Sequence, residues 1–329
     1  MPSPIRSREL VLAGILVVMV ALITVRAPVF LSAGSLDTLV TDGGILAMMA
    51  LVQMLALLTG GIDLSIAANM ALVGMVTALL SRGHPDMPVV LTAAIALGLG
   101  LVLGGVNGVL IAFVRMPPIV VTLGTMSLYR GAVFLVSRGA WVNAHELGAS
   151  YLAFPTTRLL GLTHIVWIAL AVIVSGYVFL NHTLKGRELY ALGGNRSAAR
   201  YVGIDESRIL LRVYCLTGVV SGLAGYLWVA RYAVAYTETA LGFELSTIAA
   251  CVIGGVSTAG GKGKVLGCLL GALFLVVIFN ALPMIDVSPF WQMAISGAAI
   301  LVAVVVNSRS EAPRGKVILS RGGTAKGRT

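Results

Sequence analysis

The sequence predicts an all-α protein, a polytopic bundle of about ten membrane-spanning helices. Of its 329 residues 58% are hydrophobic and only 11% are charged, whereas a soluble domain has about 25% charged residues. Apolar segments of about 20 residues, the length that a span needs, recur along most of the chain. Glycine supplies 39 residues, well above its usual share of about 7%, and small residues let membrane helices approach closely.

Ten segments have the length and composition of spans, although the eighth is short and rich in glycine. If the eighth is partly re-entrant, the count lies between nine and eleven. We expect all spans to form one transmembrane domain over 10–306, between a cytoplasmic N-terminus (1–9) and a basic, disordered cytoplasmic tail (307–329). The predicted spans are 10–32, 40–59, 64–81, 88–114, 118–137, 163–181, 211–230, 244–258, 265–282 and 289–306.

The distribution of basic residues predicts the orientation of these spans. With the N-terminus in the cytoplasm, 17 of the 23 Lys and Arg residues fall on the cytoplasmic side, as the positive-inside rule requires. An even number of spans then places both termini in the cytoplasm. Because this rule explains the net charge of +10, we predict no nucleic-acid partner.

The first motif runs from Thr59 to Ser65 between the second and third spans. A glycine pair, Gly60 and Gly61, ends one helix, and the carboxylate of Asp63 can cap the next. One interpretation is a tight turn with a helix cap. The other is a gate, because a broken helix in a membrane needs protein or a cavity to satisfy its backbone.

The second motif is a glycine-rich segment between the eighth and ninth spans. Its spacing lacks the glycine and the Ser or Thr of a phosphate-binding loop, so we predict a tight turn that binds no nucleotide and no cofactor. The turn glycines are Gly254, Gly255, Gly260 and Gly261.

A short sequence similarity between the two halves of the chain predicts an inverted repeat. Leu103–Leu110 and Leu266–Leu273 share a Gly-x-x-x-Gly spacing, which is a helix-packing pattern. By the span order they cross the membrane in opposite directions, as in many transporters.

Ionisable residues inside the spans are few, and Arg130 is the clearest of them. A charge at mid-membrane costs about 2.5–3.5 kcal/mol on insertion scales, so we expect Arg130 to point inward or to snorkel. No deep carboxylate or histidine relay and no metal-ligand spacing is evident, which predicts no catalytic and no metal site.

Residues 181–212 hold nine of the 36 charged residues in an otherwise apolar chain. The charge distribution places the loop 182–210 in the cytoplasm. A polar loop with a short helical core predicts a contact for a soluble partner.

These motifs, in this order, resemble those of the permease subunits of ABC-type monosaccharide importers, the ribose, rhamnose and autoinducer branch. The resemblance covers about residues 40–306, and the segments around Trp141–Glu146 and Ser288–Gln292 look most similar to rhamnose permeases. The stretches that carry it are Gly60–Ser65, Thr122–Met126 with Tyr129–Gly131, Gly186–Ile204 and Gly254–Gly267.

The resemblance implies a permease that is not an enzyme and that moves a monosaccharide, such as rhamnose or ribose, across a bacterial inner membrane. Its partners would be a cytoplasmic ABC ATPase, a second permease subunit of the same or a homologous kind, a periplasmic sugar-binding protein and the lipid bilayer. The alternatives are an ion-coupled secondary sugar carrier and an integral membrane enzyme.

In such importers a cytoplasmic coupling helix docks on the ATPase, and here it maps to about Asn195–Ile204. Arg196 and Arg200 would pair with acidic ATPase residues, and Ala198, Ala199 and Tyr201 would form the packed face. The predicted coupling residues are Gly194, Asn195, Arg196, Ala198, Arg200, Tyr201, Gly203 and Ile204. The predicted pathway or gate residues are Gly60, Gly61, Asp63, Thr125 and Arg130.

Overall fold

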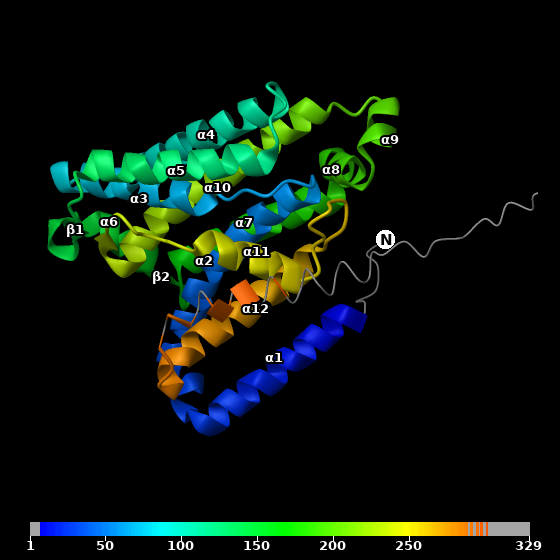
Figure 1. Cartoon of the computed structure of the whole chain (residues 1–329). Helices are drawn as coiled ribbons and strands as arrows, with labels where there is room; N and C mark the ends of the chain where they lie inside the picture. The colour runs from blue at the N-terminus through cyan, green and yellow to red at the C-terminus, as the bar shows by residue number, and fades with distance from the viewer. Residues whose placement is uncertain (1–6, 289, 292–293, 296, 299–300, 302–329) are drawn as a thin grey trace, which may run out of the picture.

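A computed structural model describes residues 7–288, 290–291, 294–295, 297–298 and 301. Within these residues, eight helices are long and apolar enough to cross a membrane, which confirms the predicted polytopic helical bundle (Figure 1). The long helices are α1 (Ser7–Arg26), α2 (Ala33–Leu58), α3 (Ile66–Gly83), α4 (Val89–Ala112), α5 (Pro118–Ser137), α7 (His164–His182), α10 (Glu206–Tyr232) and α12 (Val265–Ala281).

The predicted eighth span, 244–258, is shorter than expected. Its helix, α11 (Phe243–Ile253), has 11 residues, and a span needs about 17 or more. The helix stops where Gly254 and Gly255 follow, and Gly255 has a positive φ of 87°, which an α-helix does not tolerate. The predicted tenth span (289–306) and tail (307–329) lie largely or wholly outside the described residues, as does most of the N-terminal segment 1–9.

The shorter elements gather at two opposite ends of the bundle. We call one the α9 end, because it carries α8 (Leu184–Gly194) and α9 (Arg196–Tyr201), and the other the β1 end (Figure 1). The β1 end carries two antiparallel strand pairs, β1 (Val142–Asn143) with β4 (Val234–Ala235) and β2 (Arg158–Leu159) with β3 (Leu162–Thr163). It also has α6 (Ala149–Thr156), η1 (Pro28–Leu31), η2 (Ala144–Glu146) and η3 (Leu282–Ile285).

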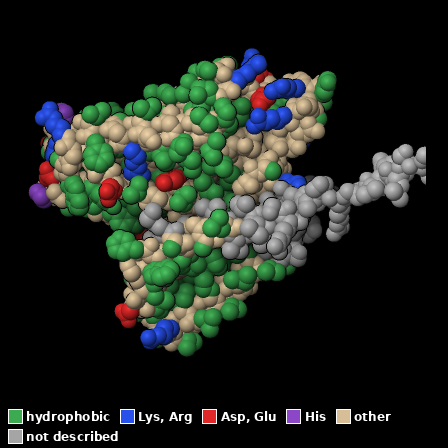
Figure 2. Space-filling model, in the orientation of Figure 1, with side chains coloured by type: hydrophobic (Ala, Val, Ile, Leu, Met, Phe, Trp, Pro, Cys, Tyr) green, Lys and Arg blue, Asp and Glu red, His purple; other side chains and the backbone are tan. Residues whose placement is uncertain are grey.

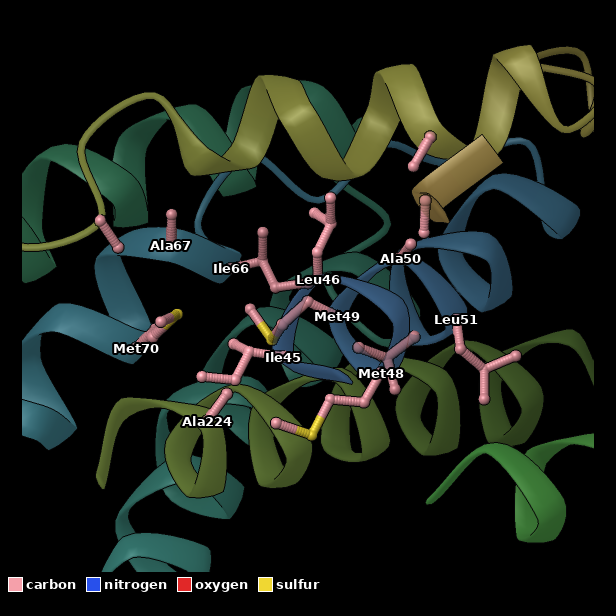
Figure 3. Packing of buried hydrophobic residues seen from close by; sticks show 14 of the residues in the cluster. Ile45, Leu46, Met48, Met49, Ala50, Leu51, Ile66, Ala67, Met70 and Ala224 are labelled. Atoms are coloured by element: carbon pink, nitrogen blue, oxygen red, sulfur yellow. The ribbon is translucent and has the colours of Figure 1, made fainter. Parts of the chain in front are cut away.

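Helix α2 is the centre of the core. From Ile45 to Leu58 nearly all of its side chains are buried, and a helix that is apolar all round belongs inside a bundle. Figure 3 shows Ile45, Met48 and Met49 of α2 near Met70 of α3 and Ala224 of α10. Helices α7, α10, α11 and α12 pack around α2. The outer faces of the bundle are covered by apolar side chains (Figure 2), as contact with lipid requires.

Glycines let α10 lie directly against α3 and α4. A Cβ atom added to Gly218 or Gly222 of α10 would overlap the backbone of α4 at Gly100 or Ala96, and one added to Gly225 would overlap α3 at Met70. No hydrophobic force drives apolar helices together in lipid, so close packing of small residues is what holds them.

The two Gly-x-x-x-Gly stretches of the predicted inverted repeat both lie at such crossings. Gly104 and Gly108 of α4 face α10, and Gly267 and Gly271 of α12 face α11. Helices α4 and α12 run in opposite directions between the two ends (Figure 1). The repeat itself remains a prediction.

A capping box fixes η2 at the β1 end. The carboxylate of Glu146 accepts a 2.8 Å hydrogen bond from the backbone N–H of Asn143 and lies 3.5 Å from Arg82. The bond from Asn143, and then the charge of Arg82, hold the pKa of Glu146 below its usual value. The segment that precedes α6 is therefore attached to the end of α3.

We expect Gly104→Ala to destabilise the protein by about 1–3 kcal/mol, the usual cost of overpacking. Its Cβ would overlap the Tyr214 carbonyl oxygen and lie 2.7 Å from the Gly218 Cα atom, so backbone must move. The measurement is the Tm of the purified protein in detergent. Gly98→Ala, on the same helix with nothing within 4 Å, is the control, and equal Tm values for the two variants would contradict the packing argument.

Candidate coupling site and the helix break beside it

The charged loop folds into two short helices whose ends are set by its own sequence. Thr183 caps α8 by accepting a 3.0 Å hydrogen bond from the N–H of Gly186. Asn195 caps α9 by accepting a 3.0 Å bond from the N–H of Ala198, the usual task of an N-cap amide oxygen. Gly203, with a φ of 81°, ends α9, and the next N–H, of Ile204, donates back to Ala199.

Both arginines of α9 are engaged within the chain. The Glu206 carboxylate lies 3.3 Å from Arg196 and accepts a 2.9 Å hydrogen bond from Nε of Arg200. Arg196 also donates to the carbonyl oxygen of Thr59, at 3.0 Å. Helix α9 is thus tied to the first turn of α10 and to the end of α2.

The outer surface of α9 differs from the expected one at one residue. Ala199 is buried and belongs to the inner face of the helix, because it packs toward the bundle. Tyr201 and Val202 are 92% and 76% exposed, and Ala198 is exposed beside them. The α9 end therefore exposes the aromatic ring of Tyr201 and the aliphatic side chain of Val202 near the two arginines. The pairing of these arginines with a partner remains a prediction.

Three segments meet through their backbones behind α9. The N–H of Gly261 donates a 2.9 Å hydrogen bond to the carbonyl oxygen of Leu58, the last residue of α2. A Cβ atom on Gly193 would overlap that same oxygen and lie 2.6 Å from the Gly261 nitrogen. We call Leu58, Gly193 and Gly261 the glycine junction, because it joins α2, α8 and the turn before α12.

The predicted tight turn forms one arm of this junction. Gly254 and Gly255 end α11, and Gly260 and Gly261 have φ values of 95° and 69°, which L side chains rarely adopt. The Ser257 N–H donates a 2.8 Å hydrogen bond to the Lys262 carbonyl oxygen, which closes the turn.

The break between α2 and α3 is built around Asp63, which is 2% exposed. Its Oδ1 atom accepts bonds of 3.0 Å from the N–H and 2.7 Å from the hydroxyl of Ser65, and its Oδ2 atom accepts a 3.0 Å bond from Thr217 of α10. Ser65 is itself the N-cap of α3, so Asp63 organises the helix start from two residues upstream.

The polar contacts of the break extend to α4 and α5. Asn107 of α4 donates a 2.7 Å hydrogen bond to the Ser65 hydroxyl, and Thr122 of α5 donates to the Ile62 carbonyl oxygen at 3.0 Å. Side chains of neighbouring helices therefore bond both the backbone and the cap residue of the break, which fits the need of irregular backbone in a membrane for protein partners.

The five predicted gate residues do not form one cluster. Gly60, Gly61 and Asp63 lie together in the break at the α9 end. Thr125 is buried and bonds to the Val121 carbonyl oxygen of its own helix. Arg130 lies toward the other end, where it donates a 2.6 Å hydrogen bond to the Thr239 carbonyl oxygen.

Comparison with known proteins shows the family of this chain. Residues 35–304 match the family described as branched-chain amino acid transport system / permease component. The chain belongs to this family. It is therefore a multi-pass permease component and not an enzyme, as predicted.

Curated relatives of the permease align along nearly its whole length. The ribose import permease protein of Escherichia coli strain K12 is 37% identical over 298 residues, which cover 90% of this chain and 92% of that protein. An autoinducer 2 import system permease protein of Enterobacter sp. strain 638 is 30% identical over 309 residues, which cover 94% and 89%. No solved structure matches the permease.

Sequence reasoning missed Gly193, Glu206, Asn107 and Thr217 as parts of this site. Polar residues within apolar spans were the available signal for Asn107 and Thr217, because such residues in membrane helices find partners. Glu206 gave a weaker signal, as a carboxylate at the start of a helix.

We expect Gly193→Ala to open the glycine junction, because a methyl group has no room there. The Gly261 amide would lose its bond to Leu58, so hydrogen exchange in a peptide covering 255–264 should become about tenfold faster. Gly194→Ala is the matched control, since its Cβ would meet nothing within 4 Å. Unchanged exchange in Gly193→Ala would contradict the role of the junction.

Proposed function

We propose that this permease is the membrane-spanning subunit of an ATP-binding-cassette importer that moves a monosaccharide or a small molecule of similar polarity across the inner membrane of a bacterium. The observation that carries the proposal is the alignment over nine-tenths of both chains with a ribose import permease. Relatives named for autoinducer 2 import support a small polar cargo. The finer resemblance to rhamnose permeases remains a hypothesis.

In this proposal the α9 end faces the cytoplasm and contacts separate ATPase subunits. The exposed Tyr201 and Val202 support it, because bare apolar side chains beside charges are typical of protein contacts. A second permease subunit and a periplasmic sugar-binding protein complete the importer, with the binding protein at the β1 end. Both termini are cytoplasmic.

The alternative is a secondary carrier coupled to an ion gradient. Among the described residues no group of three or more His, Cys, Asp or Glu side chains could hold a metal ion, and the relatives are import permeases. Neither observation favours the alternative. The deciding experiment is sugar uptake into ATP-replete vesicles: abolition by a proton ionophore alone, with no ATPase in the purified complex, would replace the importer with a carrier.

We expect Tyr201→Ala combined with Val202→Ala to reduce recovery of the ATPase with the tagged permease by about tenfold. The two side chains are the large exposed apolar groups at the end of α9, and the loss of about 1.4 kcal/mol from an interface anchor of this kind is a tenfold change in affinity. The measurement is co-purification in detergent.

The control for this experiment is Val29→Ala combined with Leu31→Ala, which removes two exposed apolar side chains at the β1 end. Equal ATPase recovery with both double variants would contradict docking at α9.

We expect Gly203→Ala to separate ATP hydrolysis from transport. A left-handed φ costs a residue with a Cβ roughly 1–2 kcal/mol, so the end of α9 would rearrange while the bundle stays folded. The measurement is the ratio of sugar imported to ATP hydrolysed in proteoliposomes, which should fall several-fold.

Gly161→Ala is the matched control for Gly203→Ala, because Gly161 also has a positive φ, of 84°, and open space around it, but lies in the β2–β3 turn. Identical ratios in the two variants would contradict a coupling role for α9.

A further inference from the structure

A cavity of about 600 Å³ lies where α2, α10, α11 and α12 meet toward the β1 end. Its volume is within the range of about 300–1,000 Å³ that small-molecule sites occupy. The residues that line it come from the first half of α2, the last two turns of α10, the loop before α11 and the last turns of α12, the helices labelled in Figure 1. None of the gate residues predicted from the sequence lines it.

One wall of the cavity is aromatic. The rings of Trp228 and Tyr232 have centroids 4.8 Å apart, and those of Trp228 and Phe243 are 5.1 Å apart in an edge-on arrangement. Tyr232 is 45% exposed and lines the cavity with Trp228 and Phe243. Clustered rings keep each other in place and offer broad apolar faces, against which the C–H face of a sugar ring packs.

Polar groups stand beside this wall. Glu238 is exposed, and its carboxylate makes no hydrogen bond or ion pair with a described residue. Asn280 uses its amide N–H group on the Val276 carbonyl oxygen, at 3.0 Å, which leaves its amide oxygen as an acceptor. Asp42, by contrast, is already held by Arg231, at 3.1 Å.

The loop that carries Glu238 is fixed from outside the cavity. Arg130 of α5 donates to the Thr239 carbonyl oxygen at 2.6 Å. The Thr239 hydroxyl in turn donates to the Tyr236 carbonyl oxygen at 2.7 Å, and Tyr236 packs on Trp141 with ring centroids 5.2 Å apart. A loop that is held in place before binding lowers the free-energy cost of binding. Arg130 therefore positions the loop that carries Glu238.

The charge of the cavity distinguishes between kinds of ligand. Among the described residues that line it there are two carboxylates, Asp42 and Glu238, and no Lys, Arg or His. A ligand with its own carboxylate, such as an amino acid, would find no cation to pair with in this lining, and its carboxylate would be repelled by Glu238, whereas the charge of Asp42 is compensated by Arg231. A neutral polyol donates its hydroxyl protons to carboxylate and amide oxygens and has no such penalty.

We propose that this cavity is a binding site in the permease itself for a neutral sugar, which stacks on the aromatic wall of Trp228, Tyr232 and Phe243 and donates hydroxyl hydrogen bonds to Glu238 and Asn280. The inference rests on the proposed function for its cargo class. It adds that the permease selects the cargo chemically and is not a passive channel for it.

The test uses the purified full-length permease in lipid nanodiscs, without ATPase or binding protein. Saturation-transfer NMR would record contact with D-ribose, L-rhamnose and L-leucine in separate samples. We expect a signal from at least one of the two sugars and none from L-leucine. In Trp228→Ala and in Glu238→Ala the sugar affinity should fall by about tenfold, the upper range for one aromatic contact.

Two control variants keep the test specific. Asp86→Ala removes an exposed carboxylate at the same end but outside the cavity, and Trp167→Ala removes a half-exposed indole on α7. Both should bind sugar like the unsubstituted protein. If Trp228→Ala fails to fold, Glu238→Ala still decides, because its side chain is exposed.

Two results would overturn the inference: no signal from either sugar, or equal affinity in the two cavity variants and the two controls. A signal from L-leucine without one from the sugars would overturn the ligand class. Because the assay contains no ATPase, a permease that co-purifies with its ATPase but shows no sugar contact refutes only this inference. One that contacts sugar but recruits no ATPase refutes only the proposed importer.

Discussion

The backbone of α10 touches the backbones of α3 and α4 through Gly218, Gly222 and Gly225, and the remaining features depend on this contact. Because no side chains separate the three backbones, the helices have little room to slide past one another, and a close-packed interior transmits such a displacement to its neighbours. The same contact brings Thr217 to Asp63 and so lets a carboxylate lie inside an apolar bundle. Loss of the glycine packing would therefore also leave the Oδ2 atom of Asp63 without the hydrogen bond from Thr217.

Helix α10 connects the two proposed functional regions of the molecule. Its first residue, Glu206, holds the arginines of α9, and its last two turns supply Trp228 and Tyr232 to the cavity. A helix of 27 residues is about 40 Å long, which is close to the full thickness of a membrane. In the proposed importer, a displacement of α9 by the ATPase would therefore reach the cavity wall through one stiff helix.

The sequence was sufficient for the features that depend on neighbours along the chain. Apolar length predicted the spans, and the family resemblance placed a short helix at about Asn195–Ile204, where α9 lies. Contacts between distant residues could not be read in this way: Asp63 and Thr217 are 154 positions apart, and the place of Ala199 on the inner face depends on where α9 rests. Segment 244–258 was counted as a span although its helix ends at Ile253, before the glycines and the polar Ser257 and Thr258.

The short length of α11 has a consequence for the barrier that a polar solute meets. At 1.5 Å per residue its 11 residues extend about 16 Å, roughly half of a hydrocarbon core of about 30 Å. Non-helical backbone within a membrane must be covered by protein or face water, and the cavity lining includes Tyr236, Glu238, Ala240, Leu241 and Gly242 from the loop before α11. In the proposed importer the hydrocarbon barrier is therefore shorter at the cavity, and a bound sugar would have less of it left to cross.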